Sequence, residues 1–369
     1  MALLQPIRFI SKDKTQFYQT LHARVDSYFK ENNLSKYANA GIFLKGIILL
    51  TAYLLPLALM CWFQPSFGWS LALWALTGVA MAGVGMSVMH DSIHGAFSAN
   101  PRINEILGYT LVLLGGAVSN WKYQHNNLHH TFTNITHYDD DIGDKPGLHL
   151  SPHTEVKLSH RYQWLHAILI YSLTTLYWAT GKDFMQFFRY KNIGLNKNTP
   201  AQNRILLAQI IGVKIIYFSI FIALPILSGI PALEVVAGFL MMHFICGIIL
   251  TIIFQLAHSV EETTHPLPNE HGIIENDWAI HQMNTTVNFS RKNRLLSWYV
   301  GGLNFQVEHH LFPKICHVHY PRISEIVKRT AAEFNVPYLE HKTFGNALRS
   351  HFALLKNYGK LPPMDELMG

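Results

Sequence analysis

Four long stretches of nearly uncharged, apolar sequence constrain the fold more than any other feature. They cover residues 46–63, 69–89, 206–227 and 231–257, with Lys214 and Glu234 as their only formally charged side chains. A helix needs roughly 20 such residues to cross a hydrocarbon core of about 30 Å. Charged residues make up only 14% of the 369 positions, which argues against a set of soluble domains. The sequence therefore predicts an all-α integral membrane protein with four transmembrane helices.

The connections between these stretches predict two hairpins. Residues 64–68 and 228–230 are short loops without Lys or Arg. Basic residues gather instead before the first and third spans, at Lys12, Lys14, Arg24, Lys30, Lys36, Lys182, Arg189, Lys191, Lys197 and Arg204. Positive charge favours the cytoplasmic side, so we expect both termini and the central segment there. Lys214 is expected to extend toward that face.

Two further apolar stretches, residues 103–120 and 164–180, are interpreted as interfacial or re-entrant helices. The first carries a Gly115-Gly116 break, and the second is short and contains His166. The resulting division is a cytoplasmic N-terminal segment over residues 1–40, a membrane domain over 41–337 and a cytoplasmic tail over 338–369. A net charge of +6 without a recognition motif gives no reason to expect nucleic-acid binding.

Histidines are unusually frequent, at 22 of 369 residues, and three groups of them follow apolar stretches. The groups read HDSIH, HNNLHH and QVEHH, and together with the histidine that follows the fourth span they contain His90, His94, His125, His129, His130, His258, His309 and His310. Histidines four positions apart share a helix face and can hold one ion from the same side. Imidazole ligands without thiolates are compatible with redox-active iron.

Spacing alone is weak evidence for a metal site. About 1.3 adjacent histidine pairs are expected by chance at this composition, and two are present. His149 and His153 also have the spacing, but Pro152 interrupts the helix that would align them. The topology is the stronger argument, because four spans place all eight histidines on the cytoplasmic side. We therefore predict a cap of metal-binding histidines there, with the other histidines in packing or surface roles.

Acidic residues next to the histidine groups suggest a supporting shell. Asp91 and Glu308 are candidates to orient a ligand imidazole through its second nitrogen. The consecutive Asp139, Asp140 and Asp141 could act in the same way or be solvated, and we expect them to be solvated. Eight histidines exceed the coordination of one ion, so two metal ions that share them are the simplest count.

A pair of redox metals at a membrane surface is suited to O2 activation and attack on an unreactive C–H bond. The sequence has no HExxH motif for hydrolysis and no GxGxxG or Walker loop for a nucleotide. We therefore expect the electrons to come from a source other than a nucleotide bound to this chain. We expect the substrate to be apolar and to enter the site from the lipid bilayer.

The three boxes, in this order and with four spans between and around them, resemble the membrane fatty acid desaturases. GGLNFQVEHHLFP, HHTFTN and FQLAHSVEE are similar to front-end acyl desaturases of the Δ5/Δ6 type, including bacterial linoleoyl-CoA desaturases. The resemblance covers residues 41–337. It implies insertion of a cis double bond into a fatty acyl chain, on CoA or on a lipid, with O2 as co-substrate and two electrons.

The resemblance also implies a di-iron centre. The box histidines would be its ligands, with His258 as an additional ligand. Gln306 stands where many desaturases have histidine and front-end members have glutamine, and the sequence leaves open whether it binds metal or only shapes the site. Many eukaryotic relatives carry a fused cytochrome b5 domain with a His-Pro-Gly-Gly motif. The only His-Pro pair here, His265-Pro266, precedes leucine, so we expect a separate donor, a ferredoxin or free cytochrome b5.

Two other readings remain open at this point. A histidine-box hydroxylase would use the same ligands to insert oxygen. A membrane metal transporter is less compatible, because transporters place substrate sites near the midplane, where only His243 lies. The expected location is a bacterial inner membrane or the endoplasmic reticulum, and the sequence does not specify double-bond position or oligomeric state.

Overall fold

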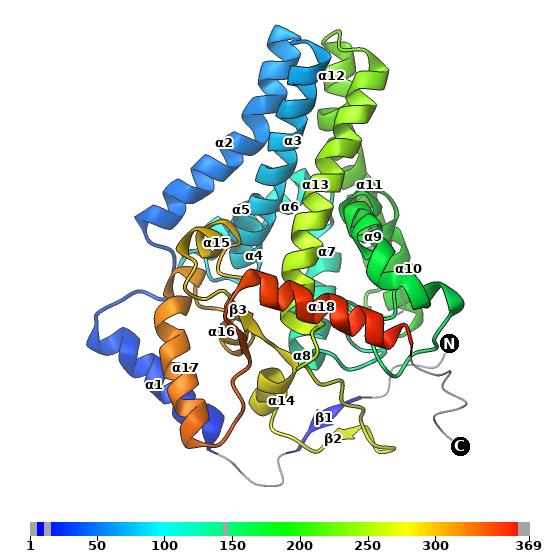
Figure 1. Ribbon diagram of the computed structural model, residues 1–369. Helices are drawn as coiled ribbons and strands as arrows, with labels where there is room; N and C mark the ends of the chain where they lie inside the picture. Colours follow the sequence, from blue (N-terminus) through cyan, green and yellow to red (C-terminus); the bar gives the residue numbers. More distant parts are fainter. Residues whose placement is uncertain (1–5, 11–15, 143–146, 361–369) are drawn as a thin grey trace. The chain divides into compact units, whose positions relative to one another are not determined.

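The computed structural model describes residues 6–10, 16–142 and 147–360, and it is mostly helical (Figure 1). Parts of the N-terminal segment and of the tail, with Lys12 and Lys14, lie outside the described residues. The chain divides into two compact units. Unit 1 contains Asn39–Tyr123 and Ile168–Ile252, and unit 2 contains Gln5–Ala38, Gln124–Ala167 and Ile253–Gly369.

Unit 1 holds most of the apolar sequence. Its helical segments are α2 (Ala40–Phe63), α3 (Phe67–Val84), η1 (Gly85–Met89), α4 (His90–Ile93), α5 (Pro101–Gly108), α6 (Thr110–Leu113), α7 (Val118–Trp121), η4 (Trp178–Lys182), α10 (Asp183–Asn192), α11 (Pro200–Phe218), η5 (Ser219–Ala223) and α12 (Leu224–Leu227). Two long helices, α9 (Gln163–Tyr177) and α13 (Ala232–His258), belong to both units along the sequence, and the segment η2 (Lys122–His129) has its first two residues in unit 1 and the others in unit 2.

Four helices among the described residues are long and apolar enough to cross a membrane. They are Ala40–Phe63, Phe67–Ile93, Pro200–Leu227 and Ala232–His258. The prediction of four such helices is therefore confirmed, and the segments over 103–120 and 164–180 are not among them. The stretch 103–120 is divided into the short helices α5, α6 and α7. The division at residues 40 and 337 stays a prediction.

The first hairpin consists of α2 and α3, which lie side by side in Figure 1. Asn39 caps the start of α2, where its side chain accepts a hydrogen bond from the amide of Ile42 at 3.1 Å. Gln64 ends α2 in the left-handed conformation and donates from its side chain to the carbonyl of Ser228 in the loop before α13. This hydrogen bond connects the loop after α2 with the loop before α13.

Glycine allows α3 and α13 to pack closely within unit 1. A Cβ atom on Gly78 would lie 2.6 Å from the carbonyl oxygen of Met242, and one on Gly238 would lie 2.0 Å from the ring of Trp74. Small residues at such contacts let helix backbones approach, which is how helices associate in lipid.

Lys214 on α11 forms an internal ion pair within unit 1. Its side chain is buried, and its ammonium group lies 2.5 Å from Asp183 Oδ2 and within 2.8 Å of the carbonyls of Gly115 and Trp178. An internal carboxylate satisfies this charge more directly than a distant interface does.

Unit 2 consists of shorter helices and two pairs of two-residue parallel strands. Its helical segments are α1 (Phe17–Glu31), η2 (Lys122–His129), α8 (His130–Phe132), η3 (Leu158–Tyr162), α14 (Trp278–Thr285), α15 (Arg294–Tyr299), α16 (Gln306–Leu311), η6 (His317–His319), α17 (Tyr320–Glu333) and α18 (Phe344–Tyr358). The strand pairs are β1 (Arg8–Phe9) with β2 (Ile273–Ile274), and β3 (Asn288–Phe289) with β4 (Glu340–His341). Within this unit α1 packs against α17 (Figure 1) and α14 against α16, around a core that includes Phe17, Leu21 and Val327.

Candidate metal centre

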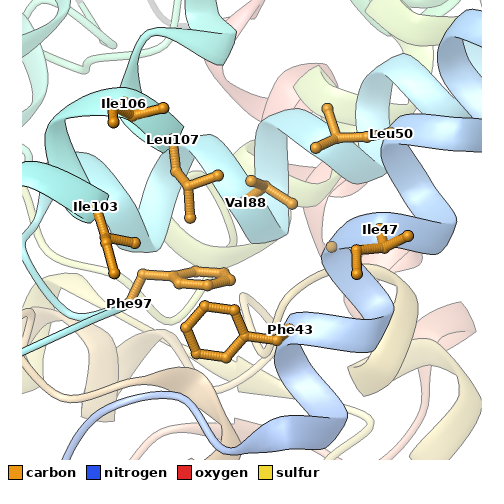
Figure 2. Close-up of a pocket in the computed structure, with 9 residues that line it drawn as sticks. Phe43, Ile47, Leu50, Val88, Phe97, Ile103, Ile106 and Leu107 are labelled. Atoms are coloured by element: carbon orange, nitrogen blue, oxygen red, sulfur yellow. The ribbon is translucent and has the colours of Figure 1, made fainter.

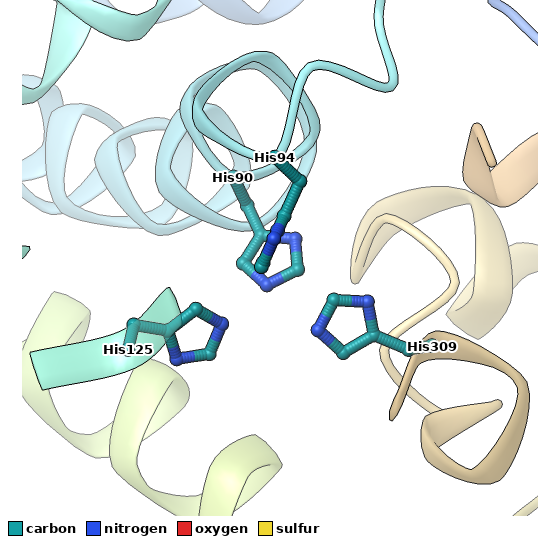
Figure 3. Close-up of side chains that lie close together, drawn as sticks. All are labelled: His90, His94, His125 and His309. Atoms are coloured by element: carbon teal, nitrogen blue, oxygen red, sulfur yellow. The ribbon is translucent and has the colours of Figure 1, made fainter. Parts of the chain in front are cut away.

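The first histidine box lies in unit 1 at the end of the second long helix. A π-helical turn, η1, leads into α4, which begins with His90 and is capped by His94, and both side chains are buried. Their ring centroids are 4.7 Å apart, and each ring packs edge-on against Trp121. Figure 3 shows both imidazoles projecting from the same side of this helix. The four-residue spacing therefore places the two imidazoles of this box side by side, as predicted.

The second box lies in unit 2 on a π-helical segment, η2, rather than on a regular α-helix. His125 and His129 stack with ring centroids 5.3 Å apart, as their spacing predicts. The wider turn also brings in the residue five positions on, since His125 Nε2 and His130 Nε2 are 3.2 Å apart. Isolated π turns occur frequently at functional sites. The sequence pattern did not predict this geometry.

Three histidines from distant parts of unit 2 converge. A ligand nitrogen from each of His129, His258 and His310 lies within 4.8 Å of the others. The three side chains come from η2, the end of α13 and α16, and all are buried. The separation of these nitrogens is short enough for a single ion to contact all three.

Hydrogen bonds hold each of these three rings in one tautomer. His129 Nδ1 lies 3.1 Å from Asp139 Oδ2, His258 Nδ1 lies 3.2 Å from the Thr285 carbonyl, and His310 Nδ1 lies 2.8 Å from Gln282 Oε1. All three partners accept, so each Nδ1 carries the proton and each Nε2 keeps its lone pair. Helix α14 supplies two of the acceptors, Gln282 and Thr285.

The Nε2 atoms satisfy the requirements of a transition-metal site. Those of His258 and His310 are buried and make no hydrogen bond within the part of the chain that the structure describes. Burial, followed by the neighbouring imidazoles, lowers the pKa of His310 well below its ordinary value, so the ring is neutral at physiological pH. Neutral imidazoles oriented through their second nitrogen are typical ligands of iron, zinc and copper.

His130 and His309 line the same part of unit 2. Their ring centroids are 4.6 Å apart, and His309 Nδ1 lies 3.2 Å from the hydroxyl of Tyr320. His309 and His125, both drawn in Figure 3, have ring centroids 6.0 Å apart. Unit 2 therefore places all six of its predicted ligand histidines in one buried neighbourhood.

Comparison with known proteins agrees with these features. The sequence matches the profile of the family described as "Fatty acid desaturase" over residues 66–342. It is 34% identical to an sn-1 linoleoyl-lipid 6-desaturase of Synechocystis sp., over 98% of this chain and 99% of the relative. A protein of the same description from Arthrospira platensis is 34% identical, over 92% of each chain. An acyl-lipid (8-3)-desaturase of Physcomitrium patens is 35% identical, over 96% of this chain and 74% of the relative.

The chain belongs to the fatty acid desaturase family. The resemblance inferred from the three boxes is thereby confirmed, and so is the expectation of an oxidoreductase. The desaturase is a multi-pass membrane protein, in agreement with its four long apolar helices.

The expected solvation of the aspartate run is wrong for Asp139. This side chain is 1% exposed and contacts His129 of the desaturase through both carboxylate oxygens. Asp140 is also buried, whereas Asp141 is partly exposed. A run of three aspartates does not distinguish Asp139, whose two oxygens accept hydrogen bonds from the backbone amides of Asn134 and Asp141.

The remaining candidate site residues are buried next to the boxes. In unit 1, Asp91 Oδ1 lies 3.7 Å from His90 Nδ1. Glu308 accepts hydrogen bonds from Asn288 at 2.8 Å and from the Tyr338 hydroxyl at 3.0 Å, and burial raises its pKa to about 7. Gln306 is 1% exposed, and its Nε2 makes no hydrogen bond to any residue that the structure describes.

Unit 1 of the desaturase also contains an apolar pocket of about 200 Å³ between α2, η1 and α5 (Figure 2). Its lining consists of Phe43, Gly46, Ile47, Leu50, Val88, Phe97, Ile103, Ile106 and Leu107. Val88 is two residues before His90 on the same helical run. The pocket can hold a hydrocarbon segment but offers it no polar contact.

Proposed function

We propose that this desaturase introduces a cis double bond into the acyl chain of a membrane lipid, as a front-end enzyme with Δ6-like selectivity. The convergence of His129, His258 and His310 with oriented Nε2 lone pairs is the observation that carries the proposal. The names of the cyanobacterial relatives support the acyl-lipid substrate and the Δ6 position.

The proposed cofactor is a pair of iron ions. Its proposed ligands are His90, His94, His125, His129, His130, His258, His309 and His310, and we leave Gln306 as a residue that shapes the site. The donor set supports iron, because it consists of neutral imidazoles without thiolate. Bound iron supplies the O2 activation needed to remove two hydrogens from a saturated carbon pair.

The protein's own groups have two tasks in this proposal. The acceptors Asp139, Thr285 and Gln282 hold imidazoles in the tautomer that binds metal. The apolar pocket of unit 1 receives a segment of the acyl chain and excludes water from it. Apolar lining favours a hydrocarbon by about 25 cal/mol for each Å² removed from water.

The remaining parts of the proposal concern the location of the site and the supply of electrons. Basic residues before the first and third spans favour a cytoplasmic site, in a bacterial inner membrane or the endoplasmic reticulum. Two electrons would come from a separate ferredoxin or cytochrome b5 that docks on this face.

The test is expression in a host that lacks polyunsaturated lipids and is fed linoleate, with double-bond positions determined by mass spectrometry. We expect a product two hydrogens lighter, with a new bond on the carboxyl side of the existing ones. His129→Ala should abolish it, and His271→Ala, at an exposed histidine, should not. A product that gains one oxygen would instead identify a hydroxylase, and activity retained by His129→Ala would refute the ligand set.

A further inference from the structure

A buried carboxylate lies directly behind one of the proposed iron ligands. The two oxygens of Asp139 are 3.2 and 3.1 Å from His129 Nδ1, and both side chains are 1% exposed or less. Since an ionised carboxylate only accepts, this contact keeps the proton of His129 on Nδ1 and the lone pair on Nε2. His129 Nε2 is then the nitrogen that carries the lone pair a metal can bind.

The carboxylate of Asp139 is itself held in place. Its Oδ2 accepts a hydrogen bond from the amide of Asn134 at 2.9 Å, and its Oδ1 accepts one from the amide of Asp141 at 2.9 Å. Two backbone donors therefore fix both oxygens before any ligand binds. Because the carboxylate is already oriented, it loses little conformational entropy when it accepts a hydrogen bond from His129. Such preorganisation is what makes a hydrogen bond to a metal ligand effective.

Asp139 differs from the other two hydrogen-bond acceptors, Thr285 and Gln282, because its side chain is charged. His258 donates to the carbonyl of Thr285 and His310 to the amide oxygen of Gln282, and both of these groups are neutral. Neutral acceptors orient a ring. A carboxylate also raises the basicity of the ring and offsets the positive charge of a bound metal.

Asp141 is the natural alternative, and its geometry is weaker. Its Oδ2 lies 3.4 Å from His129 Nδ1, its side chain is 29% exposed, and its Oδ1 accepts from Gln124 at 2.7 Å. Exposure to solvent screens its charge.

We propose that Asp139 is a positioning residue, which sets the tautomer and the donor strength of His129 toward iron. The inference rests on the proposed iron site and assigns to Asp139 a role for which the sequence favoured solvation instead.

The experiment compares Asp139→Asn with Asp141→Asn in the full-length protein, purified in detergent and stripped of metal. Asparagine retains one oxygen that can accept from the amide of Asn134, but its NH2 group replaces the oxygen that accepts from the amide of Asp141, so the charge and one backbone contact are removed together. Fe²⁺ is titrated without oxygen against a chromogenic chelator, and thermal unfolding of the metal-free protein is recorded in parallel. Mössbauer spectra of the ⁵⁷Fe-loaded variants report the ligand field.

For Asp139→Asn we expect Fe²⁺ affinity at one site to fall about 10–100-fold, with altered Mössbauer parameters, in a metal-free protein that is somewhat less stable but still folds. Asp141→Asn should lose less than about threefold, because its charge is screened. Unchanged affinity in Asp139→Asn, or equal losses in both variants, would overturn the inference while leaving the iron site intact. A wild type that binds no iron would overturn the iron site and this inference with it.

Folding is checked with a second variant, Asp139→Ser, whose hydroxyl also accepts from a backbone amide. If neither variant folds without metal while Asp141→Asn does, the carboxylate serves the fold rather than the metal, and the inference is wrong. If either variant folds and binds iron weakly, the positioning role is supported.

Discussion

Lys214 and Asp183 form a buried ion pair within unit 1, with 2.5 Å between Nζ and Oδ2. Asp183 also accepts from the amide of Ala117 at 3.1 Å, and the side chain of Asn120 donates to its carbonyl at 2.8 Å. The pair thus connects α11 with α10 and with the residues that start α7.

Removal of one partner should therefore be costly. We expect Lys214→Met to destabilise the protein by about 3–5 kcal/mol, because it leaves the Asp183 carboxylate buried without its cation. The double variant Lys214→Met/Asp183→Leu should recover much of this loss, since no uncompensated charge remains. Thermal unfolding in detergent measures both, and a double variant less stable than Lys214→Met would contradict the explanation.

The close packing of α3 and α13 gives a second prediction. Gly238→Ala places a methyl group against Trp74 and should cost about 1–3 kcal/mol. Gly212→Ala is the matched control, since a Cβ atom there has no neighbour within 4 Å. Equal unfolding temperatures for the two variants would show that the added methyl group at position 238 costs no stability, which would contradict close packing of α3 against α13 at this contact.

The apolar pocket predicts acyl-chain selectivity. Val88→Phe fills part of the cavity lined by Phe43 and Leu107, so the preferred substrate should become shorter. The comparison is with Val79→Phe, on α3 and outside the pocket lining. Feeding chains of different length and measuring the product of each tests this, and an unchanged length profile in Val88→Phe would exclude the pocket from substrate binding.

A buried histidine in unit 2 predicts a loss of stability in acid. His351 on α18 is fully buried, its Nδ1 donates to the Ser259 carbonyl at 2.7 Å, and burial lowers its pKa to about 4. The unfolded chain, with a pKa near 6.5, binds this proton first. The contribution of His351 to the free energy of unfolding is therefore fully present above pH 6.5. It decreases by about 1.4 kcal/mol for each pH unit as the pH falls from 6.5 toward 4.

Unfolding midpoints at pH 7.5, 6 and 5 check this prediction. His351→Gln should flatten the decrease, while His271→Gln, at an exposed position, should follow the wild type. His265 and His281, whose pKa values are also lowered by burial to about 4, should maintain part of the slope in both variants. Identical slopes in His351→Gln and the wild type would contradict the assignment.

The long helices were predictable because the signal is local. A run of about 20 apolar residues satisfies its own backbone hydrogen bonds and needs no partner to be recognised. The i,i+4 contacts of His90 with His94 and of His125 with His129 are local in the same sense.

Features set by tertiary contacts were not predictable. The ion pair of Lys214 was not predicted, because its partner, Asp183, is 31 positions away in sequence. Asp139 was expected in solvent for a similar reason, since nothing in a run of three aspartates distinguishes the one that a turn encloses. The two hydrogen-bond acceptors on α14 were also not predicted. A backbone carbonyl such as that of Thr285 and a single glutamine such as Gln282 form no recognisable sequence motif.

The π-helical segment over Lys122–His129 has a consequence for how the second box tolerates change in chain length. A π turn is an α-helix that carries one surplus residue. Deletion of a single residue from positions 122–124 would restore ordinary helical winding, in which positions five apart lie about 140° apart around the helix axis. His125 and His130 would then point away from each other, although every letter of the box would still be present. In this segment the count of residues matters as much as their identity.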